Sequence, residues 1–192
     1  MPTDTSLSES GKAGLPMVSP HFGGPELFVN SHGKSIVALP ADALEAATQL
    51  ALQVLEPWRS QVGPLRINRW YATKELNSLQ GGVSTSQHLL GEAADNTPLA
   101  VIQAADKKAT LRLAYEKLVR SNLPFDQAII YPDRLFIHVS HKRETPVFQP
   151  KQRRECLFCV DSAATGKKSY FPYEDYSEYL MSPLNYCTKM KK

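Results

Sequence analysis

The stretch that decides the fold is Ser86-Gln87-His88-Leu89-Leu90-Gly91-Glu92-Ala93-Ala94-Asp95, in which a histidine and a carboxylate stand seven positions apart. A zinc ion in a hydrolase takes three protein ligands from His, Asp or Glu and leaves its fourth position open to water. His88 and Asp95 can converge on one ion if the chain arrives along one strand, turns at Gly91, where the backbone is least restricted, and returns along the next strand. The two alanines before Asp95 leave room for close packing around an ion. The stretch therefore predicts two ligands of a catalytic-type zinc site.

The third ligand should come from a distant strand, and His138 is the candidate. It lies in Leu135-Phe136-Ile137-His138-Val139-Ser140, an apolar run that predicts a strand. A single histidine in such a strand is more often structural, but the pair upstream favours a ligand role here. We expect His21, His32 and His141 to be ordinary surface or loop residues, with His141 facing away from His138.

The surrounding chain predicts a mixture of helices and strands. Helical spacing of apolar residues predicts a helix that opens at residues 40–42, with Pro57 and the Val62-Gly63-Pro64 stretch as its stop signals, and a second helix over 107–120. We expect strands over 65–71, 128–130 and 135–140, the last two joined by a turn at Pro132-Asp133. This order favours an α+β fold, a small antiparallel sheet with flanking helices.

Length and charge set the broad class of the protein. The 192 residues suit one domain with extensions, and we expect a flexible arm over 1–20, a domain over 21–157 and an extension over 158–192. A formal net charge of +3 gives no reason to expect a nucleic-acid partner. No apolar run approaches the length of a membrane span, and the polar N-terminus lacks the apolar core of a secretory signal. We therefore expect synthesis in the cytoplasm, and release by other means if the protein acts outside.

Cys156, Cys159 and Cys187 do not make a disulfide framework. Cys156 and Cys159 have the spacing of half a zinc clip, and Cys187 could add a third ligand, but no fourth ligand stands at a recognisable spacing. The favoured interpretation is three reduced thiols that supply no zinc ligand.

Several motifs together resemble the zinc D-Ala-D-Ala carboxypeptidases, within the wider lysostaphin/D-Ala-D-Ala/hedgehog group of metallopeptidases. The likeness runs from about Asp42 to Leu157, and it rests on these motifs: Glu75-Leu76-Asn77, Gly81-Gly82, Ser86-Gln87-His88-x-x-Gly91-x-Ala93-x-Asp95, Phe125-Asp126-Gln127, His138-Val139-Ser140 and Arg153-Arg154. The resemblance implies a hedgehog/D-Ala-D-Ala peptidase-like fold, with His88, Asp95 and His138 as zinc ligands. Proteins of this branch cut D-Ala-containing peptides of bacterial cell walls, and many are phage lysins.

Two departures from the family pattern concern catalysis. The family has an arginine that holds the substrate carboxylate where this chain has Ala72, and strand alternation would point Arg69 to the other face. The family also places a Glu or His base shortly before the third ligand or at the end of the preceding strand. Here those positions hold Leu135, Phe136 and Tyr131. The candidates for proton transfer are therefore Asp133 in the hairpin turn, Glu92 within the zinc motif, whose family counterpart is not catalytic, and the Tyr131 hydroxyl.

These observations predict a zinc-dependent peptidase that hydrolyses D-Ala-containing peptides of bacterial peptidoglycan, of endolysin or carboxypeptidase type. Because Ala72 cannot clamp a free carboxylate, they favour endopeptidase over carboxypeptidase action. The alternative is a zinc-binding module without turnover, either a wall-binding or a virion structural protein that kept the peptidase fold.

Overall fold

A single sheet organises the molecule. The computed structural model describes residues 16–29, 38–161, 165 and 167–182, and within them six strands pair in the order β1-β2-β4-β3-β5-β6. The strands are β1 (Leu65–Arg69), β2 (Ala93–Pro98), β3 (Gln127–Tyr131), β4 (Phe136–Ser140), β5 (Glu155–Asp161) and β6 (Lys168–Pro172). Neighbours are antiparallel except β3 and β5. The predicted α+β class, an antiparallel sheet with flanking helices, is confirmed.

The first helix continues past Pro57 and ends at the Val62-Gly63-Pro64 stretch, the later of its two expected stop signals. α1 (Ala41–Leu50) continues through a π-helical turn (Ala51–Leu55) into α2 (Glu56–Val62), which ends at Gly63 with a φ of 84°. Pro57 stands in the first turn of α2, where a missing N–H is least costly. The wider π-helical turn before it absorbs the break in the hydrogen-bond ladder, so the helical segment continues past the proline.

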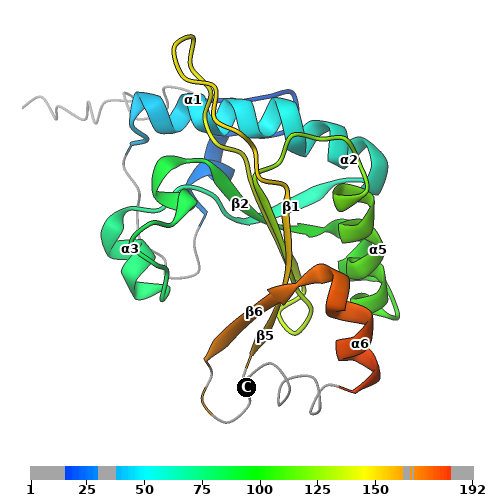
Figure 1. The fold of residues 1–192 in the computed structure, drawn as a ribbon. Coiled ribbons are helices and arrows are strands. Elements are labelled where there is room, and N and C mark those ends of the chain that lie inside the picture. Colours follow the sequence, from blue (N-terminus) through cyan, green and yellow to red (C-terminus); the bar gives the residue numbers. More distant parts are fainter. Residues whose placement is uncertain (1–15, 30–37, 162–164, 166, 183–192) are drawn as a thin grey trace, which may run out of the picture.

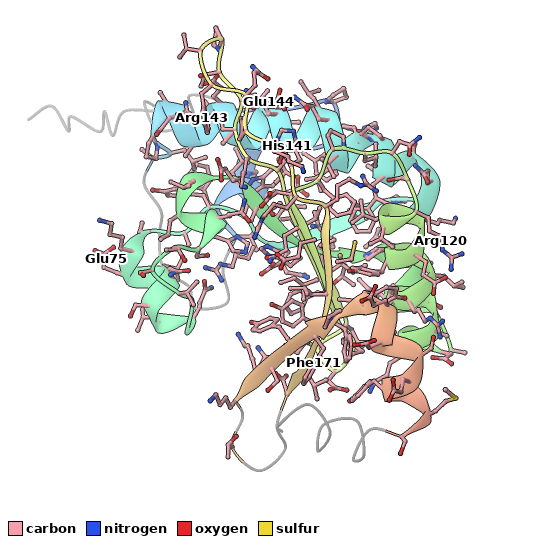
Figure 2. The ribbon with its side chains drawn as sticks, viewed as in Figure 1. Glu75, Arg120, His141, Arg143, Glu144 and Phe171 are labelled. Carbon is pink, nitrogen blue, oxygen red and sulfur yellow. The ribbon has the colours of Figure 1, made fainter. Side chains whose placement is uncertain are left out.

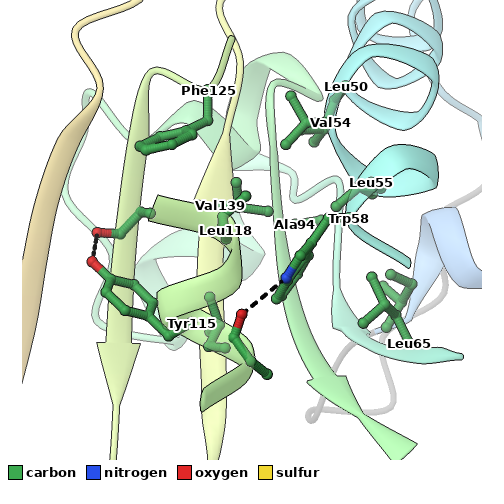
Figure 3. Packing of buried hydrophobic residues seen from close by; sticks show 14 of the residues in the cluster. Leu50, Val54, Leu55, Trp58, Leu65, Ala94, Tyr115, Leu118, Phe125 and Val139 are labelled. Atoms are coloured by element: carbon green, nitrogen blue, oxygen red, sulfur yellow. Dashed lines mark hydrogen bonds between the residues drawn. The ribbon is translucent and has the colours of Figure 1, made fainter. Parts of the chain in front are cut away.

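The core lies between the sheet and the helices α1, α2, α4 (Leu99–Gln103) and α5 (Lys107–Val119). The indole of Trp58 donates to the Ala114 carbonyl at 3.0 Å, and the Tyr115 hydroxyl donates to the Ala128 carbonyl at 2.9 Å (Figure 3). Full burial of a large apolar side chain stabilises by about 1.5–3 kcal/mol. These two aromatic residues therefore anchor α2 and α5 with satisfied polar atoms inside an apolar layer.

The opposite face of the sheet is left for the functional site. α3 (Lys74–Leu79) and the short 3-10 helix η3 (Gln87–Leu90) flank that face, with α5 on the other side of the sheet (Figure 1). Residues 141–154, here called the arm, connect β4 to β5 and project beyond α1. Another 3-10 helix, η1 (Gly24–Phe28), contacts β1.

The C-terminal segment continues the same sheet. β5 crosses the boundary between residues 157 and 158, where we expected the extension to begin, and β6, η4 (Tyr173–Asp175) and α6 (Tyr176–Met181) follow it. Tyr176 packs against Phe158 with ring centroids 5.1 Å apart. Residues 1–15 of the expected N-terminal arm, His32 and Cys187 lie outside the described residues. None of the helices described is long and apolar enough to cross a membrane.

Candidate metal centre

The register of the sheet brings Asp95 and His138 together. They are direct cross-strand partners in the antiparallel pair β2–β4, so both side chains leave the same face. His138 Nδ1 lies 2.9 Å from Asp95 Oδ1. The distance follows from pairing of strands that are separated by more than 40 residues along the chain.

His88 reaches the same point from η3 rather than from the strand that we expected. Gly91 ends η3 with a φ of 74°, a left-handed conformation that favours glycine. A side chain at this position would also collide with the backbone of Ala43. The turn places His88 Nε2 3.3 Å from Asp95 Oδ1.

The backbone fixes which nitrogen of His88 can act as a ligand. His88 is buried, with 3% of its surface exposed, and its Nδ1 lies 2.6 Å from the carbonyl oxygen of Trp70. A carbonyl can only accept, so Nδ1 carries the hydrogen and Nε2 keeps its lone pair toward Asp95. Burial lowers the pKa of His88, which keeps the ring neutral as a metal ligand requires.

The three side chains fit a zinc ion by their chemistry. One potential ligand atom from each of His88, Asp95 and His138 lies within 4.8 Å of the other two. Burial alone would raise the pKa of Asp95, but the two histidines hold it well below its ordinary value. Two imidazoles and one carboxylate form a common catalytic zinc set, and the Trp70 carbonyl supplies the outer hydrogen bond that usually orients a ligating histidine.

The triad lies in a pocket of about 820 Å³ on the open face of the sheet. Alternate residues of β3 and β4 line it with the triad, and the far side is closed by η3, the loop before it and the arm. Its lining includes Gly81, Gly82, Gln87, Glu92, Gln127, Ile129, Tyr131, Phe136, Phe148, Leu157 and Tyr170. The pocket can therefore hold a peptide-sized ligand against the three candidate ligands.

The three candidates for proton transfer occupy different places. Tyr131 lines the pocket and stacks on Phe136, and burial raises its pKa far above the ordinary value. Its hydroxyl is therefore a hydrogen-bond donor and not a base. Glu92 lines the pocket and accepts a hydrogen bond from the Arg143 backbone at 2.8 Å. Asp133 is not among the pocket residues and pairs with Lys108 at 2.7 Å on the surface.

A buried carboxylate beside the site was recognised in the sequence only as part of a motif. Asp126 has no exposed side-chain surface and binds Arg153 at 2.6 Å and Lys142 at 3.1 Å, which joins both ends of the arm to the residue just before β3. Gln87, adjacent to His88, donates to the same carboxylate at 3.3 Å. The opposite charges of Asp126 and Arg153 were the available signal, but nothing in their spacing showed that they meet.

Arg69 and Ala72 lie where strand alternation did not predict. Arg69 lines the pocket, whereas Ala72 is fully buried and its backbone N–H donates to the His88 carbonyl. Ala72 therefore helps to hold η3 but presents no side chain to the pocket.

The other histidines and cysteines that the structure describes stay outside the triad. His141 is fully buried, not exposed as we expected, and its Nε2 lies 2.8 Å from Gln53 of the π-helical turn. Arg143 and Glu144 follow it along the arm, beside α1 (Figure 2). Cys156 and Cys159 are three positions apart on β5, so they face opposite sides of the sheet and cannot clip one ion.

One comparison with known proteins identifies a family. The family model described as Peptidase M15 matches residues 21–140. The match covers 120 of the 192 residues and contains all three candidate ligands. Among curated proteins, none matches this chain.

Proposed function

Because the chain belongs to the peptidase M15 family, we propose that it is a zinc-dependent peptidase that hydrolyses D-Ala-containing peptides of bacterial peptidoglycan. The observation that carries the proposal is the convergence of His88, Asp95 and His138 at the wall of a peptide-sized pocket. Three protein ligands leave a coordination position for water, which distinguishes a catalytic zinc site from a structural one.

Two residues of the pocket supply the hydrogen-bond donor and the proton acceptor that peptide hydrolysis needs in addition to zinc. Bound zinc would polarise the scissile carbonyl and lower the pKa of its water. Tyr131, held as a neutral phenol, donates a hydrogen bond to the oxygen on which negative charge develops. Glu92 accepts the proton, because the other carboxylate of the pocket outside the triad, Asp126, is neutralised by Arg153 and Lys142.

A second candidate function is supported by the position of Glu92. It stands three residues before Asp95, which corresponds to about 10 Å along an extended chain. Proton transfer over that distance needs more than one water, and a base in direct reach contributes about 10²–10⁴-fold in rate. The alternative is therefore a zinc-binding module of a cell-wall or virion protein that lacks turnover.

The test is release of D-alanine or of cross-link peptides from purified peptidoglycan, with zinc and with a chelator. We expect zinc-dependent release by the wild-type protein and none by His88→Ala. Clearing of a bacterial wall suspension would add support for a lysin role. A protein that binds one zinc ion but releases nothing from any peptidoglycan type would exclude the peptidase and favour the non-catalytic module.

A further inference from the structure

Arg69 faces the candidate zinc site because β1 carries one extra residue. Leu65, Arg66 and Ile67 pair in regular order with Pro98, Thr97 and Asn96 of β2. The next pair is Arg69 with Asp95, so Asn68 is the extra residue of a bulge. In an unbroken strand Arg69 would face the core with Ile67. The bulge turns it to the face of Asp95, beside the triad.

The side-chain amide of Asn77 holds the guanidinium of Arg69 in place. Arg69 Nη2 donates to Asn77 Oδ1 at 2.8 Å, and Asn77 Nδ2 donates to the Val83 carbonyl at 2.9 Å. Asn77 is 3% exposed, and its side chain packs so closely on Gly82 that a Cβ there would collide with it. The Leu76-Asn77 and Gly81-Gly82 motifs therefore fix the position of the Asn77 amide, which in turn holds the Arg69 guanidinium.

The charge of Arg69 is attracted by Asp95 of the triad but is not paired with it at contact distance. Arg143 pairs with Glu45 and Arg153 pairs with Asp126, but among the described residues no carboxylate lies within ion-pair distance of Arg69. Its Nε is buried and has no hydrogen-bond partner. A partly buried cation with a buried, unused donor is costly unless a ligand completes it.

We propose that Arg69 binds the free C-terminal carboxylate of the peptide substrate and so selects chain ends over internal cross-links. A guanidinium is matched to a carboxylate by charge and by its paired donors. The inference rests on the proposed function of the same pocket, and it reverses the endopeptidase preference expected from Ala72. Arg69 supplies, from a different position of the chain, a cation that Ala72 cannot.

The experiment compares two peptides that differ only at the C-terminus. Both are acetylated and end in D-Ala-D-Ala, one as the free acid and one as the amide, with the last peptide bond N-methylated so that binding is measured without cleavage. Calorimetry on the zinc-loaded wild-type protein should show the acid binding at least about 10-fold more tightly than the amide. Arg69→Gln should weaken acid binding by about 10²-fold and leave amide binding and zinc content unchanged.

Two further variants keep the result interpretable. Arg120→Gln removes an exposed arginine at the C-terminal end of α5 (Figure 2) and should change neither affinity. Asn77→Asp places a competing carboxylate beside Arg69 and should weaken binding of the acid alone, which tests the inference even if Arg69→Gln does not fold.

Equal binding of acid and amide by the wild-type protein would overturn the inference, as would equal losses for both in Arg69→Gln. A protein that binds the acid through Arg69 but cleaves neither cleavable counterpart would remove the peptidase proposal and leave this inference standing.

Discussion

Replacing Asp126 by Asn should destabilise the protein far more than the same change at Asp133. Both carboxylates are paired with basic side chains, but Asp126 is fully buried whereas 43% of the Asp133 side chain is exposed. Asp126 accepts hydrogen bonds from the backbone, Nε and Nη2 of Arg153, and Lys142 adds an ion pair. The change to Asn keeps the shape of the side chain and removes its charge.

The magnitude follows from these contacts. A hydrogen bond to a charged group contributes about 1.5–3 kcal/mol, and an exposed ion pair contributes about 0.2–1 kcal/mol. Arg153 and Lys142 are partly exposed, so solvent screening lowers the sum. We expect Asp126→Asn to lower the free energy of unfolding by about 3 kcal/mol, and Asp133→Asn by less than about 1 kcal/mol.

The assay is urea unfolding at pH 7 in excess chelator, so that zinc binding does not contribute. With a slope near 2 kcal/mol per molar urea, the Asp126→Asn midpoint should fall by about 1.5 M. Similar midpoints for the two variants would refute the reasoning. So would a severe loss of peptidase activity in Asp133→Asn, because Asp133 is outside the pocket.

The contribution of Asp126 to the free energy of unfolding should decrease at low pH. Burial opposes ionisation of Asp126, but Arg153 and Lys142 lower its pKa below the ordinary value. A lowered pKa stabilises the folded state above the ordinary value near 3.9, and this stability is lost as the pH falls through the folded pKa. The difference between wild type and Asp126→Asn should therefore be full at pH 7 and shrink below about pH 4. A difference that does not begin to shrink as the pH falls below about 4 would contradict the assignment.

Three other substitutions test the site. Gly91→Ala should lower the free energy of unfolding by about 1–3 kcal/mol and weaken zinc binding, because the left-handed turn and the Ala43 backbone leave no room for a Cβ. Thermal unfolding and zinc titration measure the two effects, and wild-type values in both would contradict the left-handed turn at Gly91. Tyr131→Phe should lower kcat by about 10²-fold with little change in thermal stability, and an unchanged kcat would remove the hydroxyl from the mechanism. Ala72→Arg should unfold the protein, as followed by circular dichroism, because position 72 is fully buried; a folded variant with carboxypeptidase activity would show that the position reaches the pocket.

The candidate ligands could be predicted from the sequence because their chemistry and spacing are local. The run from Ser86 to Asp95 contains a histidine, a glycine that allows a left-handed turn, and a carboxylate at the start of a strand. His138 stood out as an imidazole in an apolar strand. The helices and the β3–β4 hairpin followed from apolar periodicity and a turn signal. These features depend mainly on residues close to one another along the chain.

What only the tertiary structure decided depends on cross-strand register and on contacts between distant segments. Arg69 faces the pocket because β2 pairs with β1 across a bulge at Asn68, and one extra residue reverses every side chain that follows it. Asp126 is buried and paired because Lys142 and Arg153, near the two ends of the arm, both contact it just before β3. Asp133 sits close to His138 in sequence, yet the hairpin turn carries its carboxylate out to Lys108. Alternation along one strand determines the two faces of that strand, but its neighbours determine which face meets the site.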